Sequence, residues 1–375
     1  QNGKGKIDDI DHLSNHRVRS VGELVNVSAF RIGLLRLERS IREKMSLTKT
    51  DEQITPAALV NARPIIATIS EFFRRNRLST ILDQTNPLSE VDNLRRLSVM
   101  GTGGVTRERA SFSMRDINAS QYSRICPVRS PEGPNIGLVT YLANYARVNE
   151  YGFLEAPYRK VEKITKNGKT KMRVTDEVIY VSADDEMDHY ITHAGVQIDD
   201  KSYITDEWVP VRYMGEFLEA SVEQVEYIDV VPRQVVGVAA SLIPFVSHDE
   251  ANRALMGTHM QCQAVPLVKP SSPIVGTGME SFIAEAMHHV VRARHDGEAI
   301  YVDATKIVVK LTKPLKKEKD VLTDDMSEDI RLDGDKETYM IKKFVRSAQS
   351  TCYSQRPLVK VGEKIKKGQV IVDGP

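Results

Sequence analysis

The sequence contains few cysteines and no long apolar run, and both scarcities exclude classes of protein. Three cysteines, at positions 126, 262 and 352, are too few and too widely spaced for a disulfide framework or a zinc site, which favours a reducing compartment. The longest apolar stretches, such as residues 235–246, are far shorter than the ~20 residues that cross a bilayer. No secretory leader opens the sequence, which begins at Gln1 and stops at Pro375. We therefore expect a multidomain segment of a longer protein.

Charge is unevenly distributed, although the formal net charge is only +1. Residues 1–140 carry 21 Lys and Arg against 15 Asp and Glu, whereas residues 141–230 carry 10 against 18. Such neighbouring blocks indicate one segment that faces an anion and one that does not. Ordinary variation between solvated surfaces is the alternative.

The N-terminal third predicts two helices followed by loops. Ser20 and Glu23 form a capping-box pattern for a helix to about Met45. A second helix is expected over 57–75, with Pro64 kinking or ending it. One buried face of the first helix is predicted from apolar residues at three- and four-residue steps. These are Leu24, Val27, Phe30, Leu34, Leu37 and Ile41.

Later segments predict loops and strands. Residues 76–140 are loops with specific polar groups, and 147–230 are strands, with a hairpin signal at 166–169. Residues 297–312 and 357–373 are further strands, and the charged segment 313–337 is an exposed loop.

Three motifs have competing interpretations. The loop from Gly101 to Arg109 lacks the order of a nucleotide-binding P-loop, but its glycines and arginines can hold a nucleic-acid backbone, or simply be solvated. The histidine pairs 12/16 and 189/193 have helical metal-ligand spacing without a third ligand. Residues 359–371 have the strand–turn–strand pattern of biotinyl and lipoyl carriers, but no modifiable lysine at a tip, which favours a structural role.

Eight strings, collinear over nearly the whole chain, resemble the β subunit of bacterial RNA polymerase. They are GKIDDIDHL (5–13), LDQTNPLSE (82–90), GGVTRERA (103–110), SPEGPNIGL (130–138), NEYGFLE (149–155), DEANRALMG (249–257), QAVP (263–266) and VGTGME (275–280). Residues 161–225 and 313–340 match weakly.

The resemblance implies an α+β multidomain fold. Residues 1–146 would form a helical, loop-rich fork region, and 147–230 a small β-rich external domain. Residues 231–375 would form the start of a hybrid-binding domain with β-barrel or barrel-sandwich elements.

It also implies transcription by a nucleotidyltransferase in the bacterial cytoplasm, associated with the nucleoid. The expected partners are the β′ and α subunits, sigma factor, both DNA strands, nascent RNA and nucleoside triphosphates. Mg²⁺ would be held by β′, no catalytic residue would lie here, and the segment alone would be inactive. Two alternatives remain: a split or degenerate module that binds β′ or nucleic acid without catalysis, and a carrier enzyme.

Site residues follow from the same resemblance. Arg253 would meet the incoming triphosphate, because a guanidinium matches phosphate oxygens bidentately. Gln263, Arg96 and Asn135 would lie near the RNA or hybrid. The fork-loop contacts to DNA would come from Arg107, Arg109 and Asp11, although His16 replaces a usual arginine near Asp11.

A rifamycin pocket is also implied. Its positions are Thr80, Ile81, Asp83, Ser89, Asn93, Arg96, Ser98, Pro131, Asn135, Val139 and Cys262. Four of them depart from the usual Gln, Phe, His and Arg, namely Thr80, Ile81, Asn93 and Cys262. We predict weak inhibition of the parent enzyme, because polar contacts worth roughly 1 kcal/mol each are lost.

Overall fold

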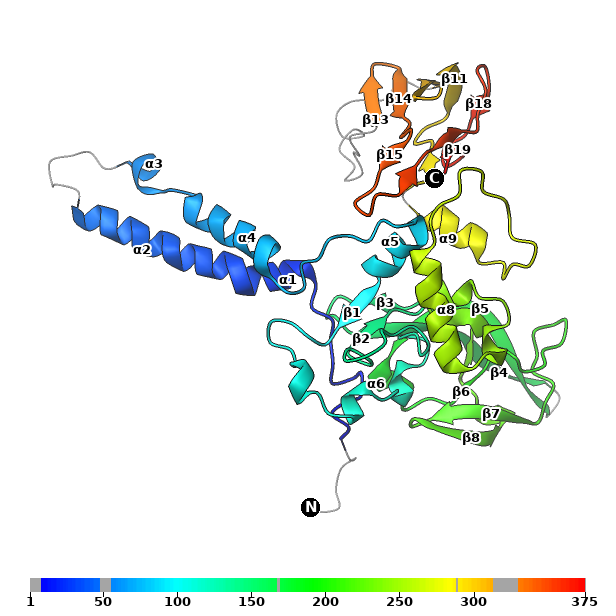
Figure 1. The fold of residues 1–375 in the computed structure, drawn as a ribbon. Coiled ribbons are helices and arrows are strands. Elements are labelled where there is room, and N and C mark those ends of the chain that lie inside the picture. Colours follow the sequence, from blue (N-terminus) through cyan, green and yellow to red (C-terminus); the bar gives the residue numbers. More distant parts are fainter. Residues whose placement is uncertain (1–7, 48–54, 167–168, 288, 313–329, 375) are drawn as a thin grey trace. The chain divides into compact units, whose positions relative to one another are not determined.

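The computed structural model describes residues 8–47, 55–166, 169–287, 289–312 and 330–374, and it combines helices with small sheets (Figure 1). The chain divides into two compact units. Unit 1 comprises residues 1–81 and 96–237, and unit 2 comprises residues 82–95 and 238–375. Within the described ranges, no helix is both long and apolar enough to span a membrane.

Unit 1 begins with packed helices. α1 (Val21–Val25), the π-helical turn η1 (Asn26–Phe30) and α2 (Arg31–Leu47) follow one another directly, and α3 (Pro56–Leu59) precedes α4 (Arg63–Arg75). α2 and α4 approach most closely at Gly33, where an added Cβ would lie 2.6 Å from Thr68 Oγ1. The single helix expected over 57–75 is wrong: α3 ends at Leu59, and Pro64 begins α4 rather than kinking or ending a helix, because its missing N–H costs nothing in a first turn.

Two details of the predicted first helix are wrong. Ser20 precedes α1 but makes no side-chain cap, and the Glu23 carboxylate instead accepts from the Arg17 guanidinium at 2.6 and 2.8 Å. The expected apolar stripe is only partly packed, since Val27, Phe30 and Leu34 are exposed and Leu24, Leu37 and Ile41 are half-buried. The fully buried residues are Ala29 and Gly33, whose small size lets the helices approach.

The rest of unit 1 is built mainly from one sheet. Its strand order is β3-β4-β9-β6-β7-β8, with β5 paired to β4, and only β6 and β9 are parallel. The strands are β3 (Arg147–Val148), β4 (Leu154–Lys166), β5 (Lys169–Ser182), β6 (Ile191–Thr192), β7 (Trp208–Tyr213), β8 (Glu216–Ser221) and β9 (Tyr227–Asp229). Alternating apolar residues such as Val209 and Val211 fill its core. The predicted strands are confirmed, whereas the expected turn at 167–168 lies outside the described residues.

Short elements connect these parts of unit 1. β1 (Arg96–Ser98) pairs with β2 (Val139–Tyr141). The remaining elements are η2 (Arg107–Arg109), η3 (Ser113–Arg115), η4 (Ala119–Gln121), α6 (Ala183–Glu186), η5 (Val222–Gln224) and η6 (Pro232–Val235).

The described part of unit 2 combines helices with short strands. The helices are α5 (Pro87–Leu94), α7 (Val238–Ser241), α8 (Ala251–Gln263) and α9 (Glu280–Ala286), with the turn η7 (Val246–His248). α5 lies within a segment predicted to be loops. That prediction is wrong there, because Asn86 caps a helix that Pro87 begins.

The strands of unit 2 share one apolar core, which includes Ile307, Tyr339 and Ile371. They are β10 (Val291–Arg292), β11 (Gly297–Val302), β12 (Lys306–Leu311), β13 (Ile330–Asp333), β14 (Lys336–Met340), β15 (Val345–Arg346), β16 (Cys352–Tyr353), β17 (Arg356–Pro357), β18 (Lys364–Ile365) and β19 (Val370–Asp373). Residues 330–337, predicted as loop, belong to the β13–β14 hairpin, and 313–329 lie outside the described residues. β18 and β19, the strands of the 359–371 pattern, belong to different sheets and therefore do not pair with each other.

Candidate nucleic-acid interface

One face of α8 carries both residues expected to meet the triphosphate and the hybrid. Arg253, Met256, Met260 and Gln263 are exposed and recur at steps of three and four. The opposite face is buried at four-residue intervals, at Ala254, Thr258 and Cys262. Ten residues separate Arg253 from Gln263, so they stand about 15 Å apart along the helix. The helix therefore presents an arginine and an amide in a line, with two flexible thioethers between them.

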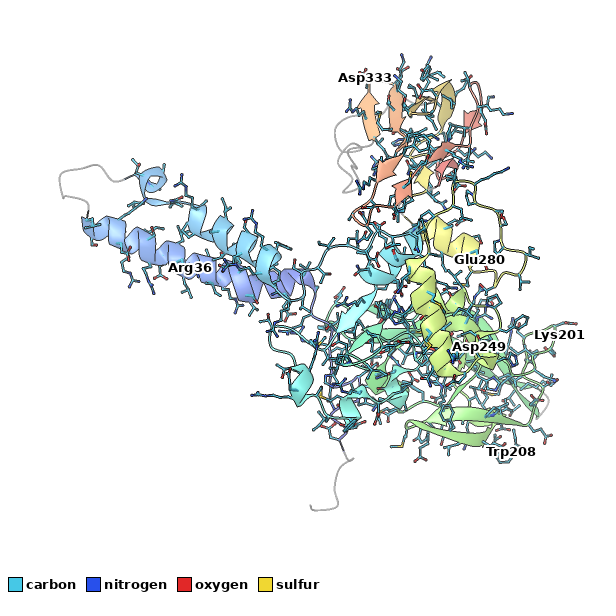
Figure 2. All side chains as sticks on the ribbon, viewed as in Figure 1. Arg36, Lys201, Trp208, Asp249, Glu280 and Asp333 are labelled. Atoms are coloured by element: carbon cyan, nitrogen blue, oxygen red, sulfur yellow. The ribbon has the colours of Figure 1, made fainter. Side chains whose placement is uncertain are left out.

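Local contacts leave the Arg253 guanidinium available. Its Nη1 donates to Met256 Sδ at 3.7 Å, a weak contact with a thioether. Asp249, labelled in Figure 2, and Glu250 immediately precede α8. A guanidinium stays protonated at any working pH, so an anionic ligand can take up its remaining donors.

The C-terminal end of α8 is held by Asn86. Its Nδ2 donates to the carbonyls of Gln261, Cys262 and Ala264 at 2.9–3.1 Å. Carbonyls at the end of a helix lack the next turn's amides, although that of Gln261 also accepts from the Ala264 amide at 3.3 Å, so a buried side-chain amide supports all three. Asn86 thereby fixes the backbone on both sides of Gln263.

Asn86 also begins α5, with Ser89 as its reciprocal partner. Asn86 Oδ1 accepts from the Ser89 amide at 2.7 Å, and Ser89 Oγ accepts from the Asn86 amide at 3.2 Å. Asp83 Oδ1 accepts from the Thr85 amide at 3.1 Å and lies 3.3 Å from Ser89 Oγ. The structure thus brings the expected pocket positions Asp83 and Ser89 into direct contact.

The other unit 2 pocket positions lie on these two helices. Asn93 is half-buried on α5. Cys262 is buried, with its Sγ 3.7 Å from Asp92 Oδ2, so it faces α5 rather than solvent.

In unit 1, η2 presents the two arginines of the expected fork loop. Arg107 and Arg109 are both exposed. Sequence reasoning missed Arg115, whose guanidinium donates to the carbonyls of Pro134 and Ile136 at 2.9 Å and of Arg107 at 3.4 Å. Arg115 therefore joins the glycine-rich loop to the 130–137 loop, and no local sequence motif predicts this role.

The strand pair β1–β2 gathers further expected residues. Ser98 and Val139 are cross-strand partners. Asn135 follows in the adjoining loop, where its carbonyl accepts from the Val139 amide at 3.4 Å. Its side-chain Oδ1 is enclosed and finds no hydrogen-bond partner among the described residues. Arg96 is exposed on β1.

The remaining expected residues of unit 1 lie apart from this strand pair along the chain. Thr80 and Ile81 are exposed at the end of the first stretch of unit 1, and Pro131 is half-buried. Asp9, rather than Asp11, holds the N-terminal loop. Its carboxylate accepts from the Asp11 amide at 3.0 Å and from Asn118 Nδ2 at 2.7 Å, contacts that hold the pKa of Asp9 below its ordinary value.

A buried ionic network that sequence reasoning missed supports unit 1. Glu186 accepts from Arg124 Nη1 and Arg212 Nη1, each at 2.5 Å, and from Tyr158 Oη at 3.0 Å. Asp229 accepts from Arg212 Nη2 at 3.3 Å. Burial opposes the charge on both carboxyls, yet the two arginines hold the pKa of Glu186 below its ordinary value, whereas burial dominates and raises that of Asp229.

Within the described ranges, no group of three or more His, Cys, Asp or Glu side chains gathers to hold an ion. His12 Nδ1 contacts Ser14 Oγ at 2.8 Å, and His189 contacts Glu226, so these members of the two histidine pairs have ordinary local partners.

Comparison with known proteins gives one consistent result. Residues 80–148 match the model of RNA polymerase Rpb2 domain 3, and 158–231 match that of the RNA polymerase beta subunit external 1 domain. The whole chain is 50% identical to the DNA-directed RNA polymerase subunit beta of Bartonella quintana and to that of Paracoccus denitrificans, and 49% identical to that of Brucella canis. It spans about a quarter of the length of these relatives, 25% to 26%.

Proposed function

Because this chain belongs to the family of DNA-directed RNA polymerase β subunits, we propose that it positions nucleic acid and the incoming nucleotide during transcription. The supporting observation is the exposed face of α8, which carries Arg253 and Gln263 on one rigid element. Positioning and fixed charge are the contributions that such a surface makes to phosphoryl transfer.

The nucleotide contact is proposed at Arg253. The reaction is attack of the RNA 3′ hydroxyl on the nucleotide α-phosphate, with the leaving charge on pyrophosphate. Mg²⁺ ions, which we place on the β′ subunit, supply Lewis-acid chemistry when bound. The guanidinium would hold the triphosphate in line, because its fork of donors matches two phosphate oxygens and stays charged.

Contacts to nucleic acid are proposed from both units. Gln263 would donate to the RNA–DNA hybrid backbone from unit 2. In unit 1, Arg96 and Asn135 would meet RNA, and Arg107 and Arg109 would meet downstream DNA phosphates. Asp11 would accept from an unpaired guanine. The partners in this proposal are β′, the α subunits, sigma factor, template and non-template DNA, and nascent RNA.

The same family membership supports the finer architecture as a proposal. Residues 1–146 would form the fork region, 147–230 the external domain, and 231–375 the beginning of the hybrid-binding domain. The short strands around the Ile307 core would contribute barrel elements to it. The enzyme would act in the cytoplasm, at the nucleoid.

The test is nucleotide kinetics in a reconstituted polymerase whose full-length β subunit contains this segment. We expect Arg253→Ala to raise the KM for nucleoside triphosphates at least tenfold, because a charge-assisted bidentate contact is worth roughly 1.5–3 kcal/mol. The KM of Arg253→Lys should lie between those of the parent and of Arg253→Ala, because lysine keeps the charge and loses the forked pair of donors. The matched control is Arg331→Ala, which removes an exposed arginine of β13 in the same unit. An unchanged KM in Arg253→Ala would reject the assignment.

A further inference from the structure

The hairpin formed by β15 and β16 grips the backbone just before α5. The Gln84 amide donates to Gln349 Oε1 at 2.8 Å, and Gln349 Nε2 donates to the Leu82 carbonyl at 3.2 Å. The Gln84 carbonyl accepts from Thr351 Oγ1 at 3.1 Å and from Tyr353 Oη at 2.8 Å. Both hydrogen-bonding groups of one peptide segment are therefore held by side chains more than 260 residues away in sequence.

The donors of this hairpin suit a permanent contact. Thr351 and Tyr353 are buried, while Gln349 is exposed at the hairpin tip. Burial, together with the charges of Glu90 and Asp83, raises the pKa of Tyr353 to about 12, so its hydroxyl stays a donor at neutral pH.

The gripped segment leads directly to the residue that holds the end of α8, where Gln263 lies. Two residues after Gln84 comes Asn86, whose amide group holds the carbonyls on either side of Gln263. Hydrogen bonds of 2.8–3.1 Å within unit 2 hold both ends of this connection, and the backbone of residues 84–86 joins them. Moving the Gln84 peptide would therefore move Asn86, and with it the backbone that carries Gln263.

We propose that residues 345–353 are a positioning element for the hybrid contact, acting on Gln263 through the 82–86 segment. The hairpin touches no substrate in this assignment. It fixes the angle at which the end of α8 meets the hybrid, so it controls how firmly a short RNA is retained rather than how fast a bond forms. This inference rests on the proposed function of Gln263.

The experiment measures release of short RNAs from the reconstituted polymerase with full-length β. Gln349→Ala removes two of the gripping hydrogen bonds from an exposed position, and Tyr353→Phe removes one from a buried position. Each lost hydrogen bond corresponds to about a fivefold change in the local opening equilibrium. We expect Tyr353→Phe to release RNA about fivefold faster and Gln349→Ala, which loses two hydrogen bonds, to release it more than about fivefold faster. The maximum extension rate of retained complexes should stay within about twofold of the parent.

Tyr301→Phe is the matched control. It removes a hydroxyl that donates to Asp303 at 2.8 Å on β11, in the same unit but outside the hairpin, and should leave release unchanged. A second readout is amide hydrogen exchange at Gln84 in the assembled enzyme, which should speed up about fivefold or more in Gln349→Ala. This readout does not depend on activity.

The outcomes distinguish the positioning role of the hairpin from the hybrid contact of Gln263. If Gln263→Ala accelerates release while Gln349→Ala and Tyr353→Phe do not, the positioning role is wrong and the proposed function stands. If Gln263→Ala also leaves release unchanged, the hybrid contact itself is wrong, and the inference falls with it. Should Tyr353→Phe disturb folding, Gln349→Ala still tests the proposal, because its side chain lies at the surface.

Discussion

The buried network of unit 1 gives the sharpest stability prediction, for the substitution Glu186→Gln. The carboxylate of Glu186 neutralises two guanidiniums at 2.5 Å, those of Arg124 and Arg212. The Arg124 side chain is 0% exposed, and those of Arg212 and Glu186 are each 12% exposed. Glutamine keeps the shape but removes the charge and turns one acceptor into a donor. Arg124 would then lose its carboxylate partner, and Arg212 would keep the carboxylate of Asp229 at 3.3 Å.

The magnitude follows from burial. Removing one partner of a buried ion pair costs about 3–5 kcal/mol, because an uncompensated charge stays behind. The remaining Arg124 contacts, to the carbonyls of Leu154, Ser120 and Val181 at 2.9–3.2 Å, satisfy donors without supplying charge. We therefore expect a loss of at least about 3 kcal/mol, a large part of the roughly 5–15 kcal/mol that stabilises a domain.

Urea unfolding of the 375-residue chain measures the loss. Trp208, labelled in Figure 2, is the single tryptophan and lies on β7 of the same sheet, but it is 65% exposed, so far-ultraviolet circular dichroism rather than its emission follows the unfolding. The matched control is Glu223→Gln, which breaks an exposed pair with Lys163 at 3.0 Å and should cost less than about 1 kcal/mol. Equal midpoints for the two variants would refute the reasoning, since burial would then add nothing.

Three further predictions follow from other contacts. The folded-state pKa of Glu186 is below its ordinary 4.5, so the free energy of unfolding should fall as the pH drops from 4.5 through the folded pKa. Urea titrations at about pH 5 to 3 should show this fall, and it should be smaller in Glu186→Gln. Asn86→Ala removes a helix cap and three carbonyl contacts, and should destabilise α5 by about 2 kcal/mol. The loss should appear as faster amide hydrogen exchange over residues 87–94, and unchanged exchange would contradict the prediction. The parent enzyme should resist rifamycins, and nanomolar inhibition in a transcription titration would contradict this. The double substitution Thr80→Gln and Asn93→His should lower the rifamycin concentration that inhibits by at least about tenfold.

Local signals predicted much of the secondary structure, because they act over a few residues. The strands expected over 147–230 include β5, whose apolar residues lie among turn signals. The helix expected over 57–75 is two helices, because Pro64 begins α4 instead of kinking or ending a helix. Periodicity identified only part of the packed face of α2, because helix approach there also depends on Gly33 fitting against Thr68 of another helix. The cap at Asn86 was readable in principle, since Asn-Pro followed by Ser is a helix-start pattern.

The candidate site also combines features that the sequence indicated with features that only the structure revealed. Residue identities over collinear strings indicated the family and named Arg253 and Gln263, because those strings are long and specific. The sequence by itself determined the chemical groups that the chain can offer to phosphate and bases. Only the tertiary structure placed Arg253 and Gln263 on one exposed face of α8, and joined Gln349 to Gln84 across 265 residues. Those contacts exist only after the chain closes on itself, and no local pattern encodes the geometry of pairs so distant in sequence.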